Sequence, residues 1–510
     1  MRSRPARSVR PAHAAEDELL AAVDIGSNSF HMVVARPILG QLRVVDRLRE
    51  TVRLAEGLDG KGGLSAEARG RAFDCLERFG QRLRPVPRAR VRAIATNTVR
   101  ALRSPQAFLV PAETALGHGI EVVSGREEAR LIYLGVAQAN PPGARRRLVV
   151  DIGGGSTEFI IGEGFTPLER ESLQVGCIAT TRRFFGDGKL SSRRWNEALT
   201  AIGAEFQQFA VPYRARGWEE AFGSSGTAKA IGALAAAAGQ GDSDITAEAL
   251  RGLRAQLLRA DRISRIEMPG LEEDRRPIIA GGLLVMEAAF AALGIERMQV
   301  SSTAMREGIL HDLLGRVTDD DPRESAIAGF GERYGVDTAQ GARVEATALR
   351  LFDQVAQAWS LSAEDRLMLG WAARLHEIGL AVAHSQYHVH GAYLLEHSDI
   401  AGFSRQEQQV LAALVHCQRR KPAVAVLQAL PGRMQTGARH LVPLLRLAVL
   451  LHRGRDDGAL PDPVLEAAGA RMTLRLPLRW LENHPLTRAD LDTECGLAGR
   501  LGFELHLSPD

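Results

Sequence analysis

The stretch Val149-Val-Asp-Ile-Gly-Gly-Gly-Ser-Thr-Glu-Phe-Ile-Ile161 places three consecutive glycines between two apolar runs. This pattern predicts a strand, a tight turn and a second strand. Glycine permits a sharp turn and lets backbone N–H groups approach a ligand closely. Asp151 stands at the mouth of the turn, where a carboxylate can hold a hard cation together with a phosphate. The stretch therefore predicts a site for a phosphate chain and its metal, with an ordinary glycine-rich hairpin as the alternative.

A second copy of the pattern, Val23-Asp-Ile-Gly-Ser-Asn-Ser-Phe-His-Met-Val-Val34, lies near the N-terminus. Aligned without gaps, Asp24 corresponds to Asp151, 127 residues further along, and a glycine and a serine of the two turns also match. Two hairpins in register indicate an internal repeat far more strongly than one does. We therefore expect two similar domains that face one another, with both turns directed into the cleft between them.

The composition is that of a globular chain without a strong overall charge. A length of 510 residues predicts three or four domains, and a formal net charge of +3 means that attraction to an anionic ligand has to be local. Four scattered cysteines provide neither a disulfide framework nor a Cys-x-x-Cys site, which favours a reducing compartment. No apolar run approaches the ~18 residues of a membrane span. We expect a cytoplasmic protein, with peripheral association with the inner membrane as an alternative.

Strand and helix patterns alternate through the first part of the chain. Leu42 to Val45 and Glu50 to Leu54 are predicted as two further strands of the first meander, and a helix is predicted from Ser65 to about Leu83. The pattern restarts at the second hairpin and includes a third glycine turn, Gly223-Ser-Ser-Gly-Thr227, at the start of a helix, a place that suits anions. The predicted boundaries are 1–18 for a disordered basic tail, 19–139 and 140–318 for two α/β domains, 319–455 for a helical domain, and 456–510 for a small C-terminal domain.

The two hairpins, the third turn and the order of elements resemble the superfamily of acetate kinase, sugar kinases, heat-shock proteins and actin. Within it, four motifs resemble the exopolyphosphatase and guanosine pentaphosphate phosphatase family. They are Ala22-Val-Asp-Ile-Gly-Ser-Asn-Ser-Phe-His-Met32, Thr96-Asn-Thr-Val-Arg100, Val123-Ser-Gly-Arg-Glu-Glu-Ala-Arg-Leu-Ile-Tyr133 and Val150-Asp-Ile-Gly-Gly-Gly-Ser-Thr-Glu158. The resemblance covers essentially the whole chain after the tail. It implies an α/β fold with two duplicated ribonuclease-H-like (actin-like) domains around a cleft, then an all-α HD-like domain and a small α+β region.

The resemblance also implies which residues act. In the family the second glutamate of the Ser-Gly-x-Glu-Glu-Ala motif is catalytic, which makes Glu128 the general base that activates water. The alternative is that Glu127 and Glu128 only favour a helix N-terminus through its dipole. Asp151, Glu158 and Asp24 are the candidate neighbours of Mg²⁺, with a monovalent cation such as K⁺ as a possible addition, and hydrogen bonding to the turn is the alternative for Glu158.

Phosphate binding is expected from the three turns and from Arg100, whose guanidinium fork suits a phosphate. For an isolated arginine a surface salt bridge would be the alternative. The phosphate-binding candidates are Ser27, Asn28, Ser29, Arg100, Gly153, Gly154, Gly155, Ser156, Thr157, Gly223, Ser224, Ser225, Gly226 and Thr227. No Gly-x-x-x-x-Gly-Lys-Ser/Thr motif occurs, which excludes a P-loop mechanism.

The helical half contains Leu375-His-Glu-Ile-Gly379, which looks like the region where His-Asp phosphohydrolases hold their metal. Because the dyad here is His376-Glu377 and no histidine occurs from 312 to 375, a helical scaffold is favoured over a metal site. No Asp or Glu occurs from Gln408 to Arg455, and Arg419, Arg420 and Lys421 are candidates for a path that guides a polyanion. A solvated basic face is the alternative.

The sequence analysis favours a Mg²⁺-dependent exopolyphosphatase that releases orthophosphate from the end of inorganic polyphosphate. A guanosine pentaphosphate 5′-phosphohydrolase, which produces the tetraphosphate, is the alternative, because both activities share these motifs. An ATP-dependent kinase or chaperone of the superfamily and a non-catalytic polyphosphate or nucleotide sensor are further alternatives. By resemblance, a homodimer is expected, and no DNA partner is expected.

Overall fold

The computed structural model describes residues 19–38, 41–140, 145–239, 244–318, 320–455 and 460–509. The chain forms two compact units, Met1–Pro322 and Arg323–Asp510, called unit 1 and unit 2 below. The predicted basic tail, residues 1–18, lies outside the described residues. Among the described helices, none combines the length and the apolar character that crossing a membrane requires.

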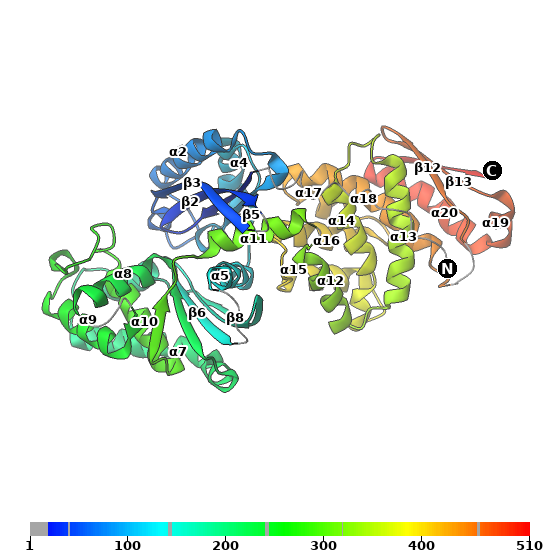
Figure 1. Ribbon diagram of the computed structural model, residues 1–510. Coiled ribbons are helices and arrows are strands. Elements are labelled where there is room, and N and C mark those ends of the chain that lie inside the picture. The colour runs from blue at the N-terminus through cyan, green and yellow to red at the C-terminus, as the bar shows by residue number, and fades with distance from the viewer. Residues whose placement is uncertain are drawn as a thin grey trace. The chain divides into compact units, whose positions relative to one another are not determined.

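The first half of unit 1 is a five-stranded sheet with helices on both faces (Figure 1). Its elements are β1 Leu20–Ile25, β2 Ser29–Ile38, β3 Gln41–Thr51, α2 Ala66–Leu83, β4 Val91–Ala95, α3 Asn97–Arg100, α4 Pro105–Leu116, β5 Ile120–Val122 and α5 Gly125–Ala139. The strand order is β3-β2-β1-β4-β5, in which β2 is antiparallel to β1 and β3, and β4 is parallel to β1 and β5. Alternate residues of β1 and β2 pack against α2 and α4 on one face of the sheet.

The second half of unit 1 repeats this topology. Its elements are β6 Arg146–Ile152, β7 Thr157–Glu163, β8 Thr166–Leu173, α6 Cys177–Phe185, α7 Ser192–Arg216, β9 Glu220–Ser224, α8 Ser225–Ala237, β10 Ile245–Thr246, α9 Ala247–Arg259, α10 Ile279–Leu293, β11 Arg297–Val300 and α11 Met305–Val317. The order β10-β11-β9-β6-β7-β8 contains the same antiparallel meander and the same parallel pair as the first sheet. The predicted duplicated α/β fold is therefore confirmed.

One prediction within the first sheet is wrong. Leu42 to Val45 and Glu50 to Leu54 were expected to form two strands, but a single strand, β3, pairs with β2 from Gln41 to Thr51. The charged residues between the two apolar runs suggested a break. They are tolerated because β3 is the edge strand of its sheet, where side chains reach solvent.

Two helices, α5 and α11, lie between the sheets and complete a shared core. Residues from the faces of β1, β2 and β4 opposite α2 and α4 join this core, together with residues of β6, β7 and β9 from the second sheet. Where the two helices cross, a glycine of each lies against the backbone of the other. A Cβ added to Gly308 would lie 1.8 Å from Leu131 O, and one added to Gly135 would lie 2.1 Å from Ala304 O. Only glycine permits such an approach.

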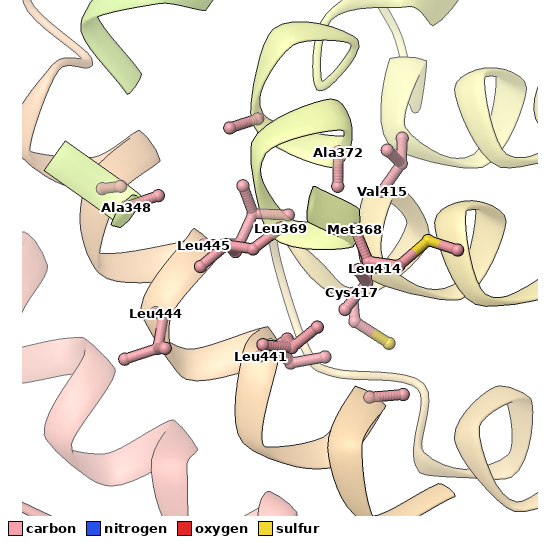
Figure 2. Close-up of a cluster of buried hydrophobic side chains, with 14 of the residues drawn as sticks. Ala348, Met368, Leu369, Ala372, Leu414, Val415, Cys417, Leu441, Leu444 and Leu445 are labelled. Carbon is pink, nitrogen blue, oxygen red and sulfur yellow. The ribbon is translucent and has the colours of Figure 1, made fainter. Parts of the chain in front are cut away.

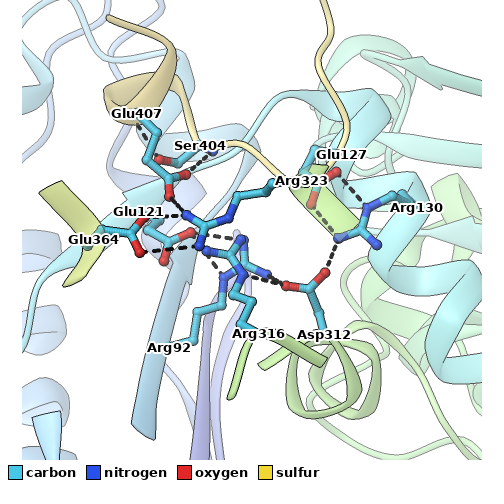
Figure 3. Close-up of polar contacts among 10 residues, drawn as sticks. All are labelled: Arg92, Glu121, Glu127, Arg130, Asp312, Arg316, Arg323, Glu364, Ser404 and Glu407. Atoms are coloured by element: carbon cyan, nitrogen blue, oxygen red, sulfur yellow. Dashed lines mark hydrogen bonds and ion pairs between the residues drawn. The ribbon is translucent and has the colours of Figure 1, made fainter. Parts of the chain in front are cut away.

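A buried ion network ties α5 and α11 to the first sheet (Figure 3). Asp312 of α11 accepts hydrogen bonds from Arg92 and Arg130, and one of 2.9 Å from Arg316. Arg130 donates two further hydrogen bonds of 2.8 Å to Glu127, the neighbour of the predicted base. Burial alone would raise the pKa of Asp312, but the three guanidinium groups hold it well below its usual range. Removing one partner would leave a buried charge uncompensated, so the network locks the first turn of α5 in place.

Unit 2 is a helical layer followed by a small mixed sheet. Its elements are α12 Pro322–Arg333, α13 Thr338–Val355, α14 Ala363–Arg374, α15 Tyr387–His397, α16 Arg405–Cys417, α17 Val424–Gln428, α18 Gly432–Leu451, β12 Val464–Ala468, β13 Arg471–Leu476, α19 Leu478–Asn483, α20 Pro485–Ala498 and β14 Glu504–Pro509. Apolar side chains of α13, α14, α16 and α18 form its core (Figure 2). Residues of β12, β13 and β14 belong to the same cluster, so the helical and C-terminal parts share one core.

Arg323 is a buried charge of unit 2 (Figure 3). It pairs with Glu364 and donates a 2.7 Å hydrogen bond to Glu407, whose own carboxylate accepts from the Ser404 N–H at 2.6 Å. The guanidinium carbon lies 4.7 Å from the ring centroid of Trp371. These contacts hold the start of α12 to α14 and α16, while the assignment of this helical region as HD-like stays a prediction.

Candidate active site

Both glycine turns of unit 1 reach one cavity. It measures about 360 Å³ and lies where the turn after β1 approaches the turn after β6. The third turn, at the start of α8, and the first turn of α5 also contribute to its wall. The predicted site residues that line it are Asp24, Ser27, Asn28, Ser29, Glu128, Asp151, Gly153, Gly154, Ser156, Ser225, Gly226 and Thr227.

The turn after β6 is held by its own backbone and has no room for side chains. The Gly153 N–H donates to Ser156 O at 2.9 Å, and N–H groups at the start of α6 donate to carbonyl groups of the turn at 2.9 Å. A Cβ on Gly155 would lie 2.5 Å from Asn97 Oδ1. Gly155 is therefore required by space, and the turn presents backbone to the cavity, as a phosphate site needs.

The third turn is anchored to the end of β6 by its hydroxyl groups. Ser225 Oγ and Thr227 Oγ1 both donate to Ile152 O, at 2.9 and 2.8 Å. Ser224 Oγ donates to the carboxylate of Asp151 and is fully buried. Because these hydroxyl groups are used inside the protein, the turn offers mainly its backbone and the start of α8 to a ligand.

Glu128 lies in the first turn of α5 and faces the cavity. Ser124 caps the helix by accepting from the Glu127 N–H at 3.2 Å, which brings both glutamates into the positive end of the helix. Glu127 points into the ion network, whereas Glu128 Oε2 accepts a 2.7 Å hydrogen bond from Arg100 Nη1. A carboxylate held this way, beside a phosphate-binding turn, is placed to orient a water molecule.

Arg100 was predicted to clamp phosphate, and the structure gives it a different contact. Its Nη1 donates to Glu128 and, at 2.9 Å, to Val123 O, and the residue does not line the cavity. Its Nη2 is buried and has no hydrogen-bond partner among the described residues. Arg100 therefore holds the predicted base, and its binding of phosphate stays a prediction.

Six of the predicted residues stand behind the cavity wall rather than on it: Arg100, Gly155, Thr157, Glu158, Gly223 and Ser224. The hydroxyl group of Thr157 is fully buried and donates to Val175 O. Glu158 accepts a 2.8 Å hydrogen bond from Ser172. The Thr157 hydroxyl group is thus used within the protein, where it joins β7 to the segment before α6.

The carboxylates around the cavity disfavour one another's charge. Burial, together with Glu128 and Asp151, raises the pKa of Asp24 to about 8. Burial also raises the pKa of Asp151 to about 6, against the opposing hydrogen bond from Ser224. The pKa of Glu158 is raised well above its usual range by burial and by the same neighbours. A cluster of this kind is stabilised by a bound cation.

The donor set fits Mg²⁺. No ion pair to Asp24, Asp151 or Glu158 occurs within the described part of the chain, and Arg306, which lowers the pKa of both Asp24 and Asp151, does not outweigh their burial. In the same described ranges, no three His, Cys, Asp or Glu side chains converge to hold a metal by themselves. Mg²⁺ is usually held by one or two carboxylates, waters and substrate phosphates, an arrangement that Asp151 and Asp24 can supply.

The sequence analysis missed a group of five cations in the cavity wall. They are Arg47, Arg49, Lys229, Arg275 and Arg306. Acidic residues near the rim pair with three of them: Glu307 with Arg47 at 3.2 Å and with Arg306 at 2.9 Å, and Asp274 with Arg49 at 3.4 Å. The guanidinium group of Arg275 packs on the third turn, where a Cβ on Gly226 would lie 2.1 Å from Nη2. The wall is therefore built for a ligand with many negative charges.

His31 is a second residue of the cavity wall that was missed. Burial, followed by Arg306 and Arg49, lowers the pKa of His31 to about 3, so the ring is neutral at pH 7. One signal for it was present: His31 pairs with Asp24 across β1 and β2, as Glu158 pairs with Asp151 across β6 and β7. The aligned repeats therefore place His31 at the position of Glu158.

The basic residues of unit 2 lie at the end of α16. The Arg419 guanidinium carbon is 5.1 Å from the ring centroid of Tyr387, and Arg420 and Lys421 are exposed. Their role in guiding a polyanion stays a prediction. In the same unit, Glu377 accepts two 2.6 Å hydrogen bonds from Arg455, so this carboxylate already has a cation partner.

Comparison with known proteins gives a consistent result. The profile of the Ppx/GppA phosphatase family matches residues 33–317, and that of Ppx/GppA phosphatase domain III matches residues 323–495. The chain is 38% identical to a guanosine-5′-triphosphate,3′-diphosphate pyrophosphatase of Pseudoalteromonas translucida, over 96% of this chain and 98% of the relative. The protein of the same name from Vibrio vulnificus is 37% identical, over 97% of this chain and 99% of the relative. An exopolyphosphatase of Cytophaga hutchinsonii, known from its crystal structure, covers 59% of this chain and 98% of its own, with a TM-score of 0.52 and 25% identity.

Proposed function

The chain belongs to the Ppx/GppA phosphatase family, and from that premise we propose that it hydrolyses the terminal 5′-phosphoanhydride bond of guanosine pentaphosphate. The sequence analysis favoured inorganic polyphosphate and kept this nucleotide as its alternative. The relatives that match nearly the whole chain carry the name of the nucleotide activity, which reverses that order.

The observation that carries the proposal is that glycine turns and five cations line one cavity beside Glu128 and Asp151. The glycine turns after β1 and β6 offer backbone N–H groups beside Glu128 and Asp151. Five cations, Arg47, Arg49, Lys229, Arg275 and Arg306, line the same cavity. Guanosine pentaphosphate carries a triphosphate and a diphosphate on different positions of one ribose, and so brings more negative charge than a triphosphate alone. A wall with this many cations suits a substrate of that charge.

Hydrolysis in this cavity requires a positioned water and stabilisation of the transferred phosphoryl group. Glu128 accepts a proton from the water as its oxygen attacks the terminal phosphorus, and the bond from that phosphorus to the bridging oxygen breaks, which releases orthophosphate and guanosine tetraphosphate. Arg100 keeps Glu128 oriented through the 2.7 Å hydrogen bond, and the turn N–H groups bind the phosphoryl oxygens. Bound Mg²⁺, held by Asp151 and Asp24, would supply positive charge to those oxygens.

The test is orthophosphate release with Mg²⁺, with guanosine pentaphosphate and long-chain polyphosphate given in parallel to one enzyme preparation. We expect a kcat/KM at least ~10-fold higher for the nucleotide, a difference of about 1.4 kcal/mol in transition-state binding. The Glu128→Gln variant serves as the background control, because losing a general base typically costs ~10²–10⁴-fold in rate. A preference for the polymer would contradict the proposed substrate but not the assignment of the hydrolytic site.

Exopolyphosphatase activity is the second candidate. It is supported by the fold match to the exopolyphosphatase of Cytophaga hutchinsonii, 98% of whose chain is covered by the match. The same base and turns would act on either substrate, because both present a terminal phosphoanhydride to them. Homodimer formation and the polyanion path of Arg419, Arg420 and Lys421 remain proposals that belong to this candidate.

A further inference from the structure

The one-turn helix α3 connects three separate parts of the active site. It follows β4 directly, and it has only four residues. Thr98 Oγ1 donates a 2.8 Å hydrogen bond to Ser27 Oγ in the turn after β1. Arg100 holds Glu128 at 2.7 Å, and Asn97 reaches the second sheet. Two polar side chains of this turn thus hold residues of the cavity wall, and the third, Asn97, ties the turn to the second sheet.

Asn97 is hydrogen-bonded to the end of the second sheet. Asn97 Nδ2 donates to Gln174 Oε1 at 2.5 Å, and Gln174 follows directly after β8. Asn97 is 8% exposed, and its Oδ1 lies against Gly155 of the second glycine turn. Gln174 itself is exposed, so packing does not hold it in place. The hydrogen bond is therefore what ties α3 to this end of β8.

The same end of β8 also approaches the start of α5. A Cβ on Gly125, the first residue of α5, would lie 2.4 Å from Ser172 Oγ, and Arg126 pairs with Glu171 at 2.9 Å. These contacts fix the backbone that carries Glu128 but not the direction of its side chain. That direction is set by Arg100, which belongs to the same turn as Asn97.

We propose that Gln174 is a positioning residue for the reaction: through its hydrogen bond to Asn97 it holds α3 in place, and α3 in turn places Arg100 against Glu128. The inference rests on the proposed function, since Glu128 must act as the base. α3 moves as one body, because the Arg100 N–H donates to Thr96 O and the Ala101 N–H donates to Asn97 O, both at 3.1 Å. A shift at Asn97 is therefore transmitted to Arg100.

The expected effect is on turnover and not on substrate affinity. Neither Gln174 nor Asn97 lines the cavity, so the turns and the cations keep their contacts with the substrate. A misplacement of about 1 Å near the reacting atoms can cost ~10²-fold in rate. Loss of one hydrogen bond at the far end of α3 should produce a smaller shift of Glu128, and we expect roughly a 10-fold decrease in kcat.

The experiment is a double-mutant cycle with Gln174→Leu, which keeps the side-chain size without the acceptor, and Asn97→Ala. Gln174→Glu, which keeps the acceptor, should restore most of the activity. Gln207→Ala, an exposed glutamine on α7, is the matched control and should behave as wild type. Each single variant should lose kcat with KM unchanged, and the double variant should be no slower than the worse single variant, because both remove the same contact.

Independent, multiplicative losses in the double variant would overturn the inference, as would an unchanged kcat for Gln174→Leu or a change confined to KM. Because Gln174 is exposed, its replacement should leave the unfolding temperature unchanged, which separates positioning from general destabilisation. The wild-type preference between guanosine pentaphosphate and polyphosphate tests the proposed function, whereas the ratio of variant to wild-type kcat on the preferred substrate tests this inference. The two can therefore fail separately.

Discussion

Asp24 and Asp151 hold equivalent positions in the two hairpins, but their surroundings give them different chemistry. Ser224 donates a hydrogen bond to Asp151, whereas no hydrogen bond to the Asp24 carboxylate occurs among the described residues. The pKa is accordingly about 6 for Asp151 and about 8 for Asp24. At neutral pH and without metal, Asp151 is mostly ionised and Asp24 mostly protonated. Asp151 is therefore the stronger candidate for the first carboxylate to meet a cation.

Asp24 should make the metal-free protein less stable as the pH rises. Its folded pKa of about 8 lies above the unfolded value near 3.8, so its favourable contribution is complete below about pH 4 and is lost as the pH rises through about 8. Asp24→Asn should therefore raise the unfolding temperature of unit 1 at pH 8.5 and change it little at pH 4.5. We expect the free energy of unfolding at pH 8.5 to increase by an amount on the order of 2 kcal/mol. This is a fraction of the value that the whole pKa shift would give at about 1.4 kcal/mol per pKa unit.

Calorimetry in EDTA at the two pH values measures this difference. Asp74→Asn, on the exposed face of α2, is the matched control and should give the same small change at both. An equal effect of Asp24→Asn at pH 4.5 and 8.5 would show that folding does not raise the pKa of Asp24.

At the scale of elements, the crossing of α5 and α11 is the contact on which the site depends. α5 begins with the turn that carries Glu128, and α11 begins with Met305 and Arg306 in the wall of the same cavity. Gly308 and Gly135 let the two backbones approach, and Asp312 joins them through Arg130. The spacing of the two helices therefore sets the distance between the base and part of the cation group.

Gly308→Ala should separate these helices. Its Cβ would lie 1.8 Å from Leu131 O and 2.7 Å from Leu131 C, both backbone atoms of α5, so the helix has to move. We expect a loss of about 3 kcal/mol in the stability of unit 1, at the upper end of the usual cost of overpacking, and a lower kcat. Gly203→Ala, on α7 with nothing within 4 Å, is the control and should stabilise by ~0.5–1 kcal/mol through helix propensity. Chemical denaturation of both variants provides the comparison, and an unchanged Gly308→Ala protein would contradict the close crossing.

At the scale of the whole molecule, the residues of the cavity and the residues of unit 2 belong to different hydrophobic cores. All residues that line the cavity belong to unit 1, and three hydrophobic clusters stabilise that unit from within. A fourth cluster, made of unit 2 residues, includes both its helices and its small sheet. The chemistry should therefore need only unit 1, and unit 2 should affect which substrates are used.

A fragment of residues 1–322 should fold and hydrolyse the substrate that the full chain prefers, with a kcat within roughly 10-fold of the full chain, or about 1.4 kcal/mol in barrier height. The measurement is phosphate release by the fragment on guanosine pentaphosphate and on long-chain polyphosphate. If unit 2 guides a polyanion, the loss in kcat/KM should be larger for the polymer. A folded fragment without activity on either substrate would mean that unit 2 completes the site.

The sequence alone predicted the duplicated fold, because that information is local and repeated. Two copies of one hairpin, apolar alternation along the strands and a third glycine turn before a helix are visible in short windows. The glycine turns and Glu128 were found for the same reason: each lies within a motif a few residues long. The family followed from these motifs, although the choice between nucleotide and polymer did not.

Only the tertiary structure decided which side chains meet. Arg47 and Arg49 lie on a strand that the sequence appeared to break, and Arg275 and Arg306 come from segments without a motif, yet all four line one cavity. Arg100 was predicted as a phosphate ligand, and only the fold shows that it holds Glu128. The reason is physical: sequence patterns report which face of an element is buried, whereas contacts between separate elements depend on how close their backbones come. Here the glycine crossing of α5 and α11 and the hydrogen bond from Asn97 to Gln174 determine that approach.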